Sequence, residues 1–218
     1  MSSTDTRWCV DDIADAIAAG LQDRVDADRA AQAVSGVDAL DELSLHPELA
    51  GALARAGYGV HREERYIGAR SKRLRSEGRR CDLVLTPDDR PLRDPQAVAT
   101  LFDDPNAVPL EDAFWLEVKT VAQHTPEGPN AAWSNELLGT VRADVSKLSK
   151  DKGILHAGLL IVLWVASEDV ATHDMGVWQD RCLELGLPIG TPSTRVLPIQ
   201  DRLGNSACVI RLYPVHHF

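Results

Sequence analysis

The alternation of hydrophobic and polar residues divides the first third of the chain into two helical segments. Apolar residues at helical spacing predict a helix over 10–34, and they are Val10, Ile13, Ile17, Leu21 and Val25. A second helical segment is expected from Ala39 to Ala56. It should be interrupted or restarted at Pro47 and end at Gly57, because proline breaks helical hydrogen bonding and glycine favours a helix end.

The next segments have the character of β-strands. Gly59–Ile67 and Cys81–Thr86 predict an antiparallel pair joined by a polar hairpin tip over 68–78, and Phe114–Val121 predicts a third strand. Between them, residues 87–113 form an irregular insertion with a helical turn expected at 96–102, because they contain many aspartates and five prolines: Pro87, Pro91, Pro95, Pro105 and Pro109.

The remaining pattern predicts an α/β fold. A helix capped by Ser134 should run to about Lys152, and the apolar run over 157–166 is typical of a central strand covered on both faces. A strand, a helix and a buried strand in this order predict a right-handed parallel crossover. A further helix over 170–185 and a closing strand over 208–213 complete the expected domain.

Length and composition favour one globular domain. The chain has 218 residues, of which 44% are hydrophobic and 26% charged, and it contains no apolar run of the roughly 18 residues that a membrane helix needs. The N-terminus lacks a basic segment followed by a hydrophobic one. Four scattered cysteines indicate reduced thiols rather than a zinc site or disulfides. These features predict a soluble cytoplasmic protein without membrane contact.

Charge is unevenly distributed along the chain. The net charge of −10 argues against a surface devoted entirely to nucleic acid. Residues 60–80, however, hold eight basic and three acidic side chains. This Arg-rich hairpin is interpreted either as solvated surface or as a phosphate-binding patch, with four candidate nucleic-acid contacts: Arg70, Lys72, Arg73 and Arg75.

The candidate chemistry lies on two of the predicted strands. Glu117 and Lys119 interrupt an apolar strand, and residues two apart in a strand point to the same face. Asp82 interrupts the neighbouring strand in the same way. Since unpaired buried charges are expensive, two carboxylates and an ammonium at this place predict a divalent-metal site for phosphodiester chemistry. Lysine is informative here because the chain has only five lysines.

The order of elements, with an aspartate on the second strand and Glu-x-Lys on the third, resembles the PD-(D/E)XK nuclease superfamily over about residues 41–166. The resemblance implies a restriction-endonuclease-like mixed β-sheet flanked by helices. It also implies a catalytic set of Asp82, Glu117, Lys119 and Glu48, in which the three acids bind Mg²⁺, or Mn²⁺ as the alternative ion. Lys119 would position or activate the attacking water.

The sequence departs from the family pattern in two respects. Cys81 stands where a proline often precedes the aspartate, and the 35 residues from Asp82 to Glu117 require the insertion to loop out. The accessory acid is left open, because Glu63 or Glu64 could replace Glu48. On this interpretation, residues 1–37 are an N-terminal helical extension and residues 38–218 form the restriction-endonuclease-like domain.

The resemblance implies a metal-dependent nuclease, with DNA as the expected substrate. One alternative is an inactive relative that keeps the fold as a binding or scaffold module, which the acidic composition favours. A third hypothesis is hydrolysis of a small phosphorylated compound. Three residues on the predicted helix after the third strand are further candidate phosphate contacts, although solvated surface is the simpler interpretation: Arg142, Lys147 and Lys150. Substrate strandedness and homodimer formation are left open.

Overall fold

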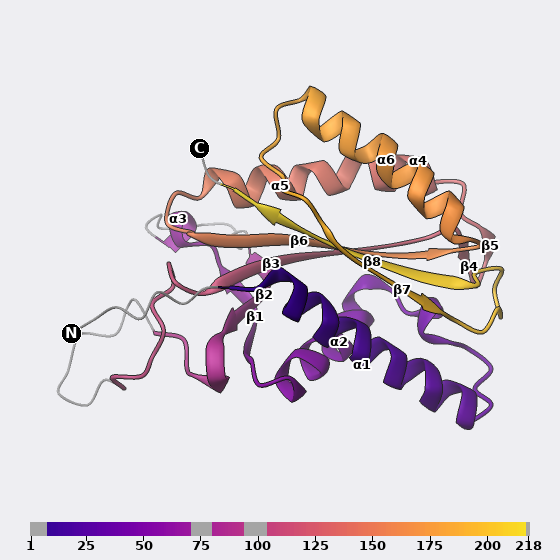
Figure 1. The fold of residues 1–218 in the computed structure, drawn as a ribbon, viewed down its shortest axis with the longest axis horizontal. Helices are drawn as coiled ribbons and strands as arrows, with labels where there is room; N and C mark the ends of the chain where they lie inside the picture. Colours follow the sequence, from indigo (N-terminus) through magenta and orange to yellow (C-terminus); the bar gives the residue numbers. More distant parts are fainter. Residues whose placement is uncertain (1–7, 71–79, 94–103, 217–218) are drawn as a thin grey trace.

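The computed structural model describes residues 8–70, 80–93 and 104–216 as three layers, a six-stranded mixed sheet between two layers of helices (Figure 1). The longer helices are α1 (Val10–Ala30), α2 (Glu42–Arg55), α5 (Val141–Lys150) and α6 (Glu168–Glu184). The sheet strands are β1 (Gly59–Arg65), β2 (Arg80–Thr86), β3 (Phe114–Ala122), β6 (His156–Val165), β7 (Ser193–Pro198) and β8 (Ala207–Val215). The short elements are η1 (Val37–Ala39), α3 (Ile67–Arg70), η2 (Pro87–Asp89), β4 (His124–Thr125), β5 (Gly128–Pro129), α4 (Trp133–Asn135) and the π-helical η3 (Glu136–Thr140).

The sheet has the strand order β1-β2-β3-β6-β8-β7. β1, β2 and β3 pair antiparallel, whereas β6 runs parallel to β3, with α4 and α5 in the connection. β8 and β7 close the sheet by antiparallel pairing. The predicted α/β class, the antiparallel first pair and the parallel crossover pairing are therefore confirmed.

Each face of the sheet has its own hydrophobic core. α1 and α2 cover one face, where Leu83, Leu116 and Leu160 point, and α5 and α6 cover the other (Figure 1). β3 and β6 are buried along almost their whole length, because strands with helices on both sides expose neither face. A polar side chain on β3 consequently lies inside the protein and needs partners there.

The N-terminal helix belongs to one of these cores. Apolar residues of α1 are buried against α2 and the sheet, including Ile13, Ile17 and Leu21. The two helices cross closely at Gly20, where an added Cβ would lie 2.1 Å from the Cβ of Ala52. α1 therefore supports the position of α2, whose first turns reach the candidate site.

Strand β2 is irregular at Asp82. Cys81 and Val84 are buried in the same core although a regular strand would point them to opposite faces, while Leu83 packs on the other side. Regular pairing with β3 runs only from Leu85 to Leu83. Beyond it, the Asp82 carboxylate accepts a hydrogen bond of 2.7 Å from the Val118 backbone N–H. The irregularity places the aspartate in the plane between the two strands.

Several boundaries differ from those expected. Strand β7 was not predicted, because it is an edge strand with alternating burial and prolines at Pro192 and Pro198. Pro47 lies within a continuous α2 in its second turn. The turn expected at 96–102 lies outside the described residues, and the described ends of the insertion meet in a bridge between Leu92 and Val108. Within the described ranges no helix is both long and apolar enough to cross a membrane.

The crossing of α1 and α2 predicts opposite effects for two glycine substitutions. Gly20→Ala should lower the free energy of unfolding by about 1–3 kcal/mol, because the new methyl group overlaps Ala52. Gly51→Ala is the matched control on α2, where the added Cβ meets only the flexible end of Arg55, at 3.4 Å. It should raise stability by about 0.5–1 kcal/mol. Urea unfolding measures both values, and equal effects would contradict the close crossing.

Candidate active site

The structure brings Asp82, Glu117 and Lys119 into one region. Glu117 and Lys119 project from the same face of β3 toward α5, as their spacing predicts, because both contact charged residues of that helix. Asp82 is joined to the strand by its hydrogen bond to Val118 N–H. The charge of Asp82 also raises the pKa of Glu117, with an effect second only to that of burial.

Glu117 is the buried carboxyl group of the site, with 2% of its surface exposed. The hydroxyl of Tyr66 donates a hydrogen bond to its Oε1, and Lys147 Nζ lies 3.9 Å from its Oε2. Burial first, and then the charge of Asp82, raise the pKa of Glu117 to about 8, although Tyr66 and Lys147 act in the opposite direction. Without a further cation, Glu117 therefore holds a proton at neutral pH.

Lys119 connects the two helical layers. Its Nζ donates a hydrogen bond of 2.8 Å to Oε1 of Glu42 on α2, and it lies 3.6 Å from Oδ2 of Asp144 on α5. Burial lowers the pKa of Lys119, but the bond to Glu42 and the charges of Asp144, Glu42 and Asp82 outweigh it and raise that pKa. Lys119 is thus an ammonium at neutral pH and can serve as an electrostatic group but not as a base.

Asp144 and Lys147 complete the cluster, and sequence reasoning missed Asp144. Lys147 donates a short hydrogen bond to Oδ1 of Asp144, three residues earlier on α5. Asp144 is 2% exposed, and its Oδ2 has no hydrogen-bond partner in the part of the chain that the structure describes. The only available signal was an aspartate within the apolar stripe of the helix, between Val141 and Val145.

The expectation for Glu48 is corrected by the geometry of α2. Glu48 forms an ion pair of 2.5 Å with Arg24 on α1, and its side chain is 37% exposed. Helix geometry places residue 48 about 200° around the axis from His46, so the two side chains leave on opposite sides. Glu42 and His46 instead lie one helical turn apart on the side of α2 that faces the sheet. Glu42 forms an ion pair with Lys119.

The alternative accessory acid, Glu63, lies close to Asp82. One carboxylate oxygen of Glu63, one of Asp82 and a ring nitrogen of His46 are all within 4.8 Å of one another. Glu63 has a left-handed backbone with φ of 56°, between the paired positions Arg62 and Glu64. The candidate ligands therefore extend from Glu117 across Asp82 to β1 and α2.

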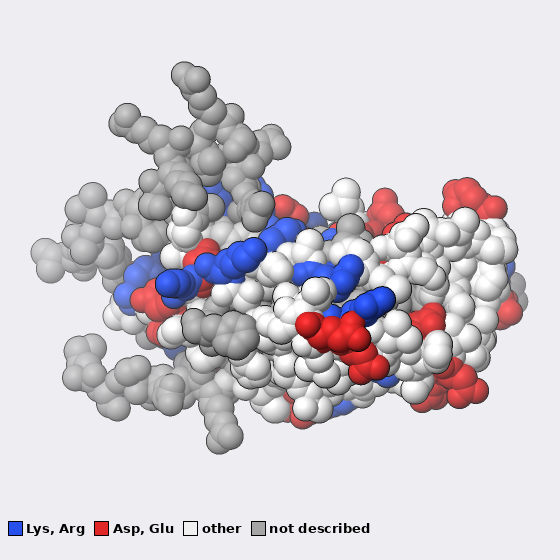
Figure 2. All heavy atoms as spheres, turned by 90° about the horizontal axis from the view of Figure 1, so that it is seen from above, with Lys and Arg blue, Asp and Glu red and all other residues white. Residues whose placement is uncertain are grey.

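The predicted nucleic-acid contacts are not placed by the structure. Lys72, Arg73, Arg75 and the side chain of Arg70 lie outside the described residues. On the face over α5 and α6, Lys and Arg side chains form a band that reaches the middle, with Asp and Glu beside them and also at the end near β4 and β5 (Figure 2). The described part of this face carries both signs of charge.

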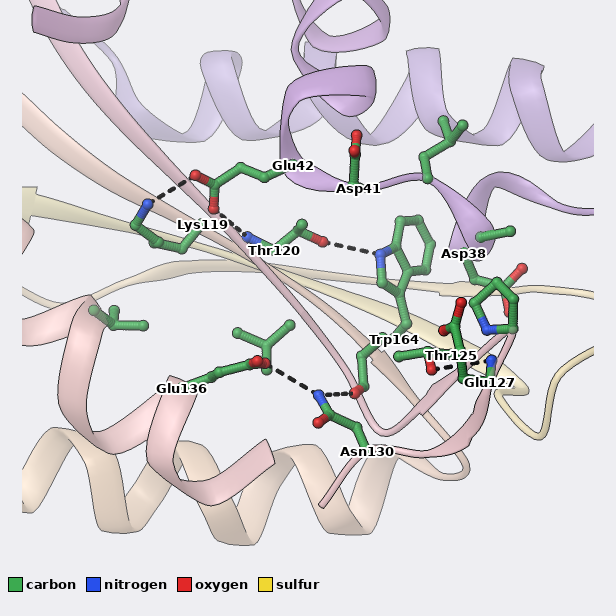
Figure 3. A pocket seen from close by; sticks show the side chains of 16 residues that line it. Asp38, Asp41, Glu42, Lys119, Thr120, Thr125, Glu127, Asn130, Glu136 and Trp164 are labelled. Atoms are coloured by element: carbon green, nitrogen blue, oxygen red, sulfur yellow. Dashed lines mark hydrogen bonds and ion pairs between the residues drawn. The ribbon is translucent and has the colours of Figure 1, made fainter. Parts of the chain in front are cut away.

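A pocket of about 590 Å³ opens beside Lys119. Glu42, Lys119 and Thr120 line one part of it, and Glu136 and Asn130 face them from the other side (Figure 3). The Thr120 hydroxyl accepts a hydrogen bond from the Trp164 indole at 3.0 Å, which fixes the pocket wall. Its remaining carboxylates are Asp38, Asp41 and Glu127, so among the described residues that line the pocket Lys119 is the one cationic side chain.

No protein-family model, curated protein or solved structure matches this chain. The chemistry of the site must therefore be argued from its own residues. The carboxylates of Asp82 and Glu117 suit a hard divalent cation, which prefers oxygen ligands. Asp82 raises the pKa of Glu117, and a cation at this place would offset that repulsion.

The raised pKa of Glu117 predicts a specific pH dependence of stability in the presence of EDTA. Below pH 4.5, the ordinary value, both folded and unfolded states hold the proton. Between pH 4.5 and about 8, only the unfolded state releases it, so the stability of the folded state falls as pH rises. Above this window the loss is complete.

Glu117→Gln removes this titration while keeping the shape of the side chain. From pH 5 to pH 8, the free energy of unfolding of the parent minus that of Glu117→Gln should fall by about 1–4 kcal/mol. Mg²⁺ should reduce the fall, because a bound cation favours the carboxylate. Denaturant unfolding at several pH values measures the difference, and parallel curves for the two proteins would refute the buried titration.

Proposed function

We propose that this protein hydrolyses phosphodiester bonds in nucleic acid, with DNA as the substrate, in a reaction that depends on a divalent cation. The observation that carries the proposal is the presence of Glu117 and Lys119 on one face of β3 beside Asp82. The buried Glu117 and the Lys119 ammonium each lie beside side chains of opposite charge, and Asp82 lies at the edge of the cluster. Such groups match the charges that change during phosphoryl transfer.

Each residue has a role that follows from its contacts. Hydrolysis adds a water oxygen to phosphorus and releases the sugar oxygen as an alcohol. The Lys119 ammonium would donate hydrogen bonds to the attacking water or to a phosphate oxygen, since its raised pKa keeps it protonated. Asp144 would act as a positioning residue, because it contacts both Lys119 and Lys147.

Asp82 and Glu117 would hold a cation such as Mg²⁺. One Asp82 oxygen is engaged by the Val118 N–H, which orients the carboxylate, and Glu117 is fixed by Tyr66. When bound, such an ion supplies a more acidic water and offsets negative charge on phosphate. Lys147, 3.9 Å from Glu117, would then be less tightly held by that carboxylate and could contact phosphate.

A binding or scaffold module is the second candidate, and the acidic pocket favours it. Glu42 forms a hydrogen bond of 2.8 Å with Lys119, and the other charged side chains lining the pocket are carboxylates. An acidic lining repels phosphate and attracts basic groups. Under this alternative, Lys119 serves folding by joining α2 to β3, and no metal-dependent cleavage occurs.

Substitution of Lys119 separates the two candidates. Lys119→Met keeps much of the apolar stem, so a role in the chemical step predicts a rate of DNA cleavage lower by about 10²–10³-fold with little loss of stability. Lys152→Met, at an exposed position just after α5, is the matched control and should cleave at the parental rate. The measurement is metal-dependent cleavage of plasmid and of single-stranded DNA. Equal cleavage by parent, Lys119→Met and Asp82→Ala would refute the nuclease proposal.

The Arg-rich hairpin supplies a separate prediction about binding. Neutralising Arg70, Lys72, Arg73 and Arg75 together should weaken DNA binding and reduce the slope of log affinity against log salt concentration by up to about four units, since each phosphate contact releases counterions. Fluorescence anisotropy at several salt concentrations, with a catalytically inactive Asp82→Ala background, measures the slope. An unchanged slope would assign the hairpin to solvated surface.

A further inference from the structure

Three potential metal ligands meet on the α2 side of Asp82. His46 comes from α2, Glu63 from β1 and Asp82 from β2, and one ligand atom from each lies within 4.8 Å of the other two. Ligands at about 2.1 Å from an ion are separated by at most about 4.2 Å. Because Glu63 is exposed, its side chain is free to turn toward the other two ligands. The three side chains can therefore surround one cation.

His46 provides an independent indication of a ligand at this place. Its ring is 2% exposed, and Nε2 has no hydrogen-bond partner among the residues that the structure describes. A buried polar atom without a partner is costly, by about 1–3 kcal/mol, and such atoms are rare in folded proteins. A metal ion bound at Nε2 would use the lone pair that the described residues leave without a partner.

The two carboxylates are suited to complete the site. The bond from Val118 N–H to Oδ2 holds the Asp82 side chain in one orientation beside His46. Glu63 is exposed, so the cation would be open to solvent on that side and could keep water or phosphate as further ligands. His46 lies on α2 one turn after Glu42, and this one helical face therefore supports both the cation and Lys119.

We infer that His46, Glu63 and Asp82 bind a divalent transition-metal ion, with Mn²⁺ as the ion to test. The inference deepens the proposed function, on which the catalytic use of the ion rests, by assigning the metal class and two ligands beyond the carboxylate pair. Mg²⁺ favours oxygen ligands and retains waters, whereas an imidazole nitrogen suits Fe²⁺, Ni²⁺ or Zn²⁺, and Mn²⁺ is the transition-metal ion that shares the carboxylate preference of Mg²⁺. The ligand set thus gives the site a preference for a transition metal over Mg²⁺.

The test measures metal binding in the absence of DNA. Titration of MnCl₂ into the full chain, followed by the electron paramagnetic resonance signal of free Mn²⁺, gives the affinity. Electron spin-echo modulation of the bound ion reports a coordinated histidine nitrogen. We expect binding with nitrogen coupling in the parent, competition by ZnCl₂ at lower concentration than by MgCl₂, and at least about tenfold weaker binding in Glu63→Gln.

Two further variants identify the nitrogen. His46→Leu replaces the ring by an apolar side chain of similar size and removes a polar atom that has no hydrogen bond. The variant should therefore fold, and its bound Mn²⁺ should show no nitrogen coupling. Glu111→Gln and His173→Asn change exposed residues outside the triad and serve as matched controls that bind Mn²⁺ like the parent. Thermal unfolding confirms the fold of every variant.

The outcomes for metal binding and for cleavage are separable. Mn²⁺ binding that needs His46 and Glu63, without DNA cleavage, supports the metal site and refutes the nuclease. If the parent cleaves DNA, but His46→Leu and Glu63→Gln keep the Mn²⁺ affinity and the nitrogen coupling of the parent, the proposed metal site is wrong. The nuclease proposal is then still supported. Absence of Mn²⁺ binding by the parent also overturns the inference.

Discussion

The burial of Glu117 is the constraint on which the rest of the site depends. A carboxyl group in the middle of a sheet covered on both faces loses its water and must find partners within the protein. Tyr66 supplies a hydrogen bond and Lys147 a nearby positive charge, yet the pKa of Glu117 is still raised to about 8. These partners therefore do not fully offset the cost of burial, and a cation beside Glu117 would favour its carboxylate form.

This constraint extends through alternating charges to both helical layers. Lys147 is held by Asp144, Asp144 lies beside Lys119, and Lys119 is bonded to Glu42. The chain of contacts runs from α5 through β3 to the first turn of α2. Removal of Lys147 would leave the buried Asp144 with Lys119, 3.6 Å away, as its remaining charged partner among the described residues, which is more costly than the loss of a surface ion pair. Stability and site geometry are thus maintained by the same interactions.

The sequence predicts the parts of this arrangement that depend on local periodicity. The period of two in β3 places Glu117 and Lys119 together, and the apolar run of β6 identifies a central strand beside it. Period alone does not show which helix face meets the sheet. The resemblance implies Glu48 as the accessory acid, but the crossing with α1 turns Glu48 toward Arg24 and leaves Glu42 and His46 at the site.

The unpredicted features share a dependence on distant contacts. Asp144 has the sequence context of an ordinary helical residue, and only the packing of α5 over β3 gives it two lysine neighbours. Strand β7 buries too few of its residues to be recognised from the sequence, because its strand conformation depends on pairing with β8. The pairing of β2 with β3 ends at Leu83, and the Asp82 carboxylate instead accepts a hydrogen bond from Val118 N–H. No pattern of residues in the sequence predicts this irregularity.

The most direct measurement is the titration of Glu117 itself, followed by ¹³C nuclear magnetic resonance of its side-chain carboxyl carbon with and without a divalent cation. If Asp82 and Glu117 hold a divalent cation, the pKa of Glu117 is about 8 in EDTA and falls well below 7 when Mg²⁺ or Mn²⁺ is added. The same pKa with and without cations would contradict a metal site at Asp82 and Glu117.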